Sequence, residues 1–116
     1  MTKFLVLYIS PISSAQMMAG ATPEQAQAGM DAWMAWAQKN GDAVVDLGVP
    51  LGSSKRIVTG LVSAGSTHVS GYSVIEAESL DAATAMLEDH PHLHTPGGAV
   101  EVLESLPMPG PAPSGA

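Results

Sequence analysis

KFLVLYI, residues 3–9, is the stretch that decides the fold. Its branched and aromatic residues are typical of a β-strand, and Ser10 and Pro11 end it. Alternate side chains of a strand point to opposite faces of a sheet, yet both alternating sets are apolar here. We therefore predict a strand that is buried on both faces, rather than one with a face toward water.

A helix is predicted over residues 22–40. Thr22 is a suitable N-cap, Gln25 completes a capping box, and Gly41 provides the residue that ends the helix. The apolar positions recur at helical spacing and predict an inward stripe of Ala26, Met30, Trp33, Met34 and Ala37. Trp36 lies at the shoulder of that stripe and is therefore a candidate pocket or interface residue.

The rest of the chain shows an alternation of strand and helix patterns. Further strands are predicted at 42–51, 57–62, 72–77 and 99–103, with a second helix at 80–89 and a loop at 10–21. This order predicts an α+β domain with the ferredoxin-like plan βαββαβ over residues 1–106. Residues 107–116, rich in Pro and Gly, are expected to form a flexible tail.

The apolar first strand also predicts a homodimer. A ferredoxin-like domain carries both helices on one face of its sheet, so the opposite face needs another cover. The simplest cover is the same sheet of a second copy in an isologous contact. The low content of charged residues, 13%, agrees with a partly covered surface. The alternative is a monomer in which the loop at 10–21 covers part of that face.

Charge and composition exclude several classes of function. The net charge is -7 with only four Lys and Arg residues, which argues against binding to nucleic acid or to anionic membranes. The absence of cysteine excludes disulfides, thiol nucleophiles and Cys-ligated metals. No apolar run approaches the ~20 residues of a membrane span. We expect a cytoplasmic protein, and the sequence demands no cofactor.

Two stretches carry a family resemblance. GYSVIEAESLDAATAMLEDHPHL at 71–93 and PGGAVEVLESLP at 96–107 resemble the C-terminal half of YCII-related (DGPF-type) domains. These belong to the dimeric α+β barrel superfamily, so the resemblance implies two ferredoxin-like domains that join their sheets, and a pocket for a small ligand. The Asp-Gly-Pro-Phe run of that family is missing, because residues 64–71 read AGSTHVSG. No role of that Asp is carried over.

Three histidines alternate at His90, His92 and His94. In an extended segment they project to one side, where three imidazoles and a water can bind zinc or copper. Alternate histidines on a loop are a weak signal for a metal, and a helix cap followed by solvated residues is the simpler interpretation. An imidazole also serves as a general acid or base, and His92 and His94 are the candidates for that catalytic role.

Tyr8, Ser10, Trp36 and His68 are the candidate ligand-binding residues. Each also has a simpler interpretation as a core aromatic or an exposed loop residue. We predict a dimeric domain that binds a small organic molecule. If it is an enzyme, a histidine in an apolar pocket is its general acid or base. The alternative is a non-catalytic dimeric module for interaction or regulation.

Overall fold

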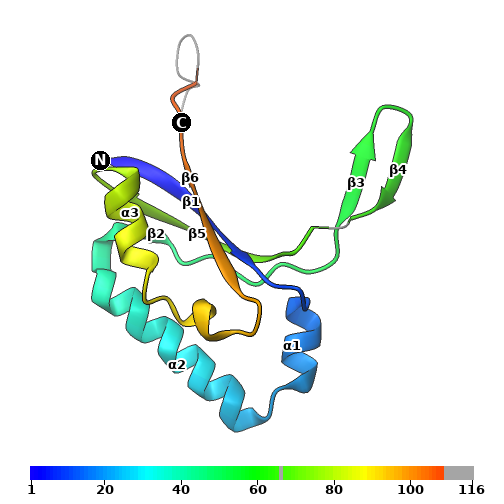
Figure 1. Cartoon of the computed structure of the whole chain (residues 1–116), viewed down its shortest axis with the longest axis horizontal. Coiled ribbons are helices and arrows are strands. Elements are labelled where there is room, and N and C mark those ends of the chain that lie inside the picture. Colours follow the sequence, from blue (N-terminus) through cyan, green and yellow to red (C-terminus); the bar gives the residue numbers. More distant parts are fainter. Residues whose placement is uncertain (66, 109–116) are drawn as a thin grey trace.

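The computed structural model describes residues 1–65 and 67–108. Within these ranges the predicted α+β class is confirmed: a four-stranded antiparallel sheet, three α-helices and a separate two-stranded sheet are present (Figure 1). All but the first two residues of the predicted tail at 107–116 lie outside the described residues. No helix in the described part of the chain is long and apolar enough to cross a membrane.

The four-stranded sheet places the apolar first strand at its centre. Its order is β2 (Val44–Asp46), β5 (Val69–Ala77), β1 (Thr2–Ile9) and β6 (Ala99–Glu104), with every neighbouring pair antiparallel. Strands that are distant in sequence therefore lie side by side, as β1 does with β5 and β6. This order is consistent with a ferredoxin-like fold.

The two faces of β1 have different environments. Phe4, Val6 and Tyr8 point into the core and are buried. This core lies between the sheet and α2 (Pro23–Asn40), α3 (Leu80–Leu87) and the 3-10 turn η2 (Pro91–His94) (Figure 1). On the opposite face Leu5 is exposed, and its neighbours Leu7 and Val74 are half-buried. Burial of the strand is thus complete on one face, and we call the other the open face.

The capping signals of α2 are confirmed. The Thr22 hydroxyl accepts from the backbone N–H of Gln25, and the Gln25 side chain accepts from the backbone N–H of Thr22. Gly41 ends the helix with a φ of 56°, a conformation that favours glycine. The first helix of the ferredoxin-like plan therefore begins and ends where the sequence predicts.

The predicted inward stripe of α2 is wrong in part. Met30 and Met34 are exposed, whereas Trp36 is buried and Trp33 packs against the core. Only the C-terminal part of α2 reaches the core, so apolar residues nearer its N-terminus stay exposed although they have helical spacing. Trp36, predicted at the shoulder, is the most buried residue of the helix.

Three further segments differ from the prediction. The expected loop at 10–21 contains α1 (Ser14–Gly20), which begins with a capping box of Ser13 and Gln16. The expected strand at 57–62 is instead a hairpin of β3 (Lys55–Val58) and β4 (Leu61–Ala64), because Gly60 forms the turn with a φ of 79°. The strand predicted at 42–51 is reduced to the 3-10 turn η1 (Gly41–Ala43) and β2.

Candidate functional site

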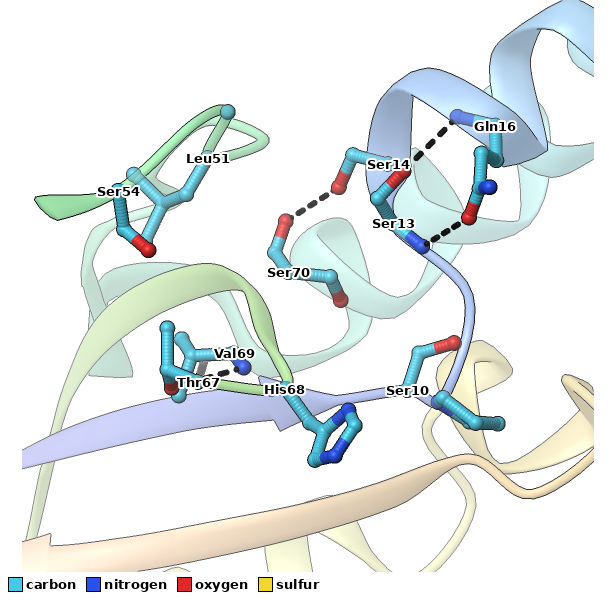
Figure 2. A pocket seen from close by; sticks show the side chains of 12 residues that line it. Ser10, Ser13, Ser14, Gln16, Leu51, Ser54, Thr67, His68, Val69 and Ser70 are labelled. Atoms are coloured by element: carbon cyan, nitrogen blue, oxygen red, sulfur yellow. Dashed lines mark hydrogen bonds between the residues drawn. The ribbon is translucent and has the colours of Figure 1, made fainter. Parts of the chain in front are cut away.

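A polar cleft of about 180 Å³ lies at the C-terminal end of β1. We call it the serine cleft, and its lining is Ser10, Pro11, Ser13, Ser14, Gln16, Leu51, Gly52, Ser54, Thr67, His68, Val69 and Ser70. Figure 2 shows that these residues come from the segment between β1 and α1, the start of α1, the segment before β3, and the start of β5 with the residues before it. Its volume is below the ~300 Å³ at which pockets for drug-sized ligands begin, so it suits a small ligand.

Two of the predicted ligand-binding residues meet in this cleft. The backbone N–H of Ser10 donates to the carbonyl of His68 over 2.9 Å, which joins the end of β1 to the segment before β5. The His68 side chain is exposed, whereas Ser10 is buried. The structure therefore brings together the backbones of two residues that are far apart in the sequence, and both residues line the cleft (Figure 2).

The hydroxyls of the serine cleft keep hydrogen-bonding capacity for a ligand. Those of Ser10, Ser13 and Thr67 each accept from a backbone N–H two or three residues further along. A hydroxyl has one donor and two acceptor positions, so among the described residues each of these three retains its O–H donor. Among the described lining residues none is Lys, Arg, Asp or Glu. The cleft therefore suits a small ligand with oxygen acceptors.

A second group of predicted residues lies in the core at the same end of β1. We call Tyr8, Trp33, Trp36, His90 and His92 the histidine cluster. The His90 ring stacks on Tyr8 with centroids 4.7 Å apart and meets the two Trp rings edge-on at 4.5 and 4.6 Å. The cluster is packed, so these side chains form part of the core rather than the wall of the serine cleft.

His90 is fully buried and neutral. Its Nδ1 accepts from the backbone N–H of His92 over 3.0 Å, so the neutral ring carries its proton on Nε2. That Nε2 has no hydrogen-bond partner among the described residues. Burial lowers the pKa of His90 to about 4; the neighbouring His92 acts in the same direction and Asp89 acts against it. The ring is therefore uncharged at neutral pH.

His92 is held in one tautomer by the end of β1. Its Nε2 lies 2.8 Å from the carbonyl oxygen of Ile9, and a carbonyl only accepts, so Nε2 carries the proton. In this tautomer the lone pair is on Nδ1, and a general base requires such a free lone pair. Because Ile9 precedes Ser10, His92 also fixes the strand end that borders the serine cleft.

Tyr8 and Trp36, both predicted to bind ligand, hydrogen-bond within the core. The Tyr8 hydroxyl donates to Ser73 Oγ over 2.8 Å, and Trp36 Nε1–H donates to the carbonyl of Met86 over 2.9 Å. Burial raises the pKa of Tyr8 to about 12, although the bond to Ser73 acts against this shift. Tyr8 therefore stays protonated and does not exchange protons near neutral pH.

His94 does not join His92. Residues 91–94 form a 3-10 turn, in which successive residues are about 120° apart, so side chains two positions apart diverge. The expectation of an extended segment with converging imidazoles is thus wrong. His94 is exposed and borders a separate shallow groove of about 330 Å³ with Lys39 and Asp89. Within residues 1–65 and 67–108, no group of three His, Cys, Asp or Glu side chains is placed to hold a metal.

Several residues of the site were not found from the sequence. His90 was interpreted as a helix cap, and Ser13, Ser54 and Thr67 were not singled out. One signal was available: Ser13 followed three residues later by Gln16 is the same capping-box pattern that places the start of α2. That pattern predicts α1 and, with it, one wall of the serine cleft.

No protein-family model matches the sequence, and no curated protein matches it either. The resemblance to YCII-related domains therefore stays a prediction from residues 71–107.

Proposed function

We propose that the chain is a homodimeric small-molecule-binding domain of the YCII-related type, with its ligand site in the serine cleft. The observation that carries the proposal is the meeting of Ser10 and His68 in a cleft whose hydroxyls retain O–H donors. Such donors pair with carbonyl or carboxylate oxygens of a ligand. The partner is a small organic molecule.

The dimeric part of the proposal is supported by the open face of the sheet. Leu5 and Leu103 are exposed there, and Leu7, Ile9 and Val74 on that face are half-buried. A row of branched side chains across the central strands favours contact with another apolar layer. The same face of a second copy provides such a layer through two-fold symmetry, as in dimeric α+β barrels.

The enzymatic form of the proposal assigns general-base catalysis to His92. The Ile9 carbonyl holds the His92 proton on Nε2 and leaves the lone pair on Nδ1. Because buried His92 does not line the serine cleft, this form of the proposal requires the core to open beside Ile9 when the substrate binds. Candidate reactions are proton transfer, isomerisation and lyase-type steps. His94, exposed at the separate groove, has no part in this form of the proposal.

Ligand binding is tested with the full untagged chain. Native mass spectrometry identifies a co-purified molecule, and a ¹⁵N-labelled sample is titrated with small carboxylic acids and ketones. Ser10→Ala and His68→Ala are expected to weaken binding about tenfold or more, while His94→Ala leaves it unchanged. Amide shifts that cluster around His94 rather than Ser10 would contradict the assignment of the site.

The dimer is tested by light scattering of the full chain and of Leu5→Lys. A mass of about twice 11.8 kDa is expected for the wild type, and a monomer for the variant, because the lysine brings a charged group between Val74 and Leu103, where two apolar faces are proposed to meet. Met30→Lys is the matched control, since Met30 is exposed on α2 and lies away from the sheet. A wild-type monomer at micromolar concentration overturns this part of the proposal.

The second candidate function is a non-catalytic dimeric interaction module. It is favoured by the β3–β4 hairpin, which carries apolar side chains but adds nothing to the core of its own chain.

A further inference from the structure

The β3–β4 hairpin (residues 55–64) has apolar pairs on both of its faces. Ile57 lies opposite Val62, and Val58 lies opposite Leu61. Opposite residues share a face of a two-stranded ribbon and successive residues alternate, so each face carries one pair. The exposed fractions are 75% for Ile57, 61% for Val62 and 60% for Leu61. Four branched side chains are thus displayed to both sides of one ribbon.

Such a hairpin needs support from outside itself. All eight strand residues are exposed, and Figure 1 shows the ribbon standing away from the body of the domain. A two-stranded hairpin by itself is at best marginally stable in water. Exposed apolar side chains that gather in one place are typical of a protein–protein contact. The hairpin therefore has the properties of an arm that another surface covers.

The charge of the hairpin indicates what covers it. Lys55 and Arg56 are two of the four cationic residues, and the hairpin contains no acidic residue. The net charge of -7 is therefore the sum of +2 on the hairpin and -9 on the rest of the chain. A second copy of this chain offers the complementary charge. Its open face carries Glu76 and Glu101, which pair across the sheet with Lys3 and Leu7 of β1.

The position of the hairpin fits the same partner. The segments that precede and follow the hairpin lead from Pro50 and to Gly71, which form an isolated bridge at the β2 edge of the four-stranded sheet. In Figure 1 the hairpin projects beyond the end of the sheet on the side away from α2, and α1 lies at the same end. The open face of the sheet is also directed away from α2. When two open faces meet, each hairpin extends along the other copy.

We propose that the β3–β4 hairpin is a dimerisation arm, which packs its apolar pairs and its two cations on the open-face side of a second copy. This inference rests on the proposed homodimer. It adds a contact between the hairpin and the second copy, which the joining of the two sheets alone does not provide.

The test is photo-cross-linking in the full chain. p-Benzoylphenylalanine replaces Ile57, and equal amounts of ¹⁴N- and ¹⁵N-labelled chains are mixed before irradiation. Cross-linked peptides with one light and one heavy chain, mapping to β1, β5 or β6 of the second copy, support the arm. A dimer by light scattering whose cross-links join only residues of one chain overturns the arm and leaves the dimer standing. A monomer by light scattering overturns both.

Substitutions measure the contribution of the arm. Ile57→Ser combined with Val62→Ser is expected to raise the dimer dissociation constant at least tenfold in sedimentation equilibrium. The matched control, Met18→Ser with Met30→Ser, removes apolar side chains of similar exposure from the helices and is expected to change it less than twofold. Arg56→Glu leaves the apolar pairs intact and is expected to weaken the dimer most at low ionic strength. Unchanged dissociation constants in both hairpin variants overturn the proposal.

Discussion

Replacement of His90 by Phe is expected to remove a large part of the acid sensitivity of the fold. The pKa of buried His90 is about 4, against an ordinary value of 6.5 that the unfolded chain regains. The unfolded chain therefore binds more protons between these values, and the folded state loses stability as the pH falls through that window. For a single group with these pKa values the loss is about 2 kcal/mol at pH 5 and about 3 kcal/mol below pH 4.

At pH 7.5 the same substitution has two opposing effects. Phe removes the Nδ1 acceptor of the buried His92 N–H, which costs about 1–3 kcal/mol, and also removes the buried Nε2–H that has no partner among the described residues. The relief of that unpaired donor is worth about 1–3 kcal/mol. We therefore expect His90→Phe to be nearly neutral at pH 7.5 and more stable than the wild type at pH 5.

The measurement is urea unfolding at pH 7.5 and pH 5, at one protein concentration because a dimer unfolds with concentration-dependent stability. The wild type should lose about 2 kcal/mol more than His90→Phe between the two pH values. His94→Gln, which removes an exposed histidine, should follow the wild type. Equal losses in the wild type and in His90→Phe would refute the inference that burial keeps His90 neutral.

Two further substitutions test close contacts of the fold. Gly48→Ala is expected to destabilise the chain by roughly 3 kcal/mol or more in urea unfolding, because its Cβ would lie 1.7 Å from the Tyr72 carbonyl oxygen and its φ is 77°. Gly52→Ala, with nothing within 4 Å, should stay within about 0.5 kcal/mol, and equal effects would contradict the close approach of Gly48 to β5. Trp36→Phe should cost about 1–3 kcal/mol, since the Met86 carbonyl loses its donor; an unchanged midpoint in the same assay would show that this bond adds no stability.

Local patterns predicted those elements whose signals lie within one segment. The strand at 3–9 followed from its composition, and the helix at 22–40 followed from its capping box and from Gly41. The hairpin was missed because the apolar pairs on either side of Thr59 and Gly60 were interpreted as one strand, and Gly60 was not taken as a turn. The predicted set of buried residues on α2 was also wrong in part, because helical spacing does not show how far a helix extends beyond the sheet that it covers.

Some residues of the candidate site were likewise suggested by local sequence, and others were not. Ser10 and His68 were separate candidates in connections next to strands, and the pairing of β1 with β5 brings these connections together. The burial of His90 depends on Tyr8 and Trp33, which lie on two other elements. A pattern within residues 90–94 carries no information about those rings, so the sequence could suggest only a cap at His90.

The histidine cluster and the serine cleft are joined by a short series of backbone contacts. His90 Nδ1 accepts from the His92 N–H, the His92 ring donates to the Ile9 carbonyl, and the next residue, Ser10, donates its N–H to the His68 carbonyl. A protonated His90 has no lone pair on Nδ1, so it cannot accept from His92. Protonation of His90 therefore removes the contact that orients His92, and through Ile9 it affects the strand end at the cleft. His90 is in this sense a positioning residue for a site that it does not touch.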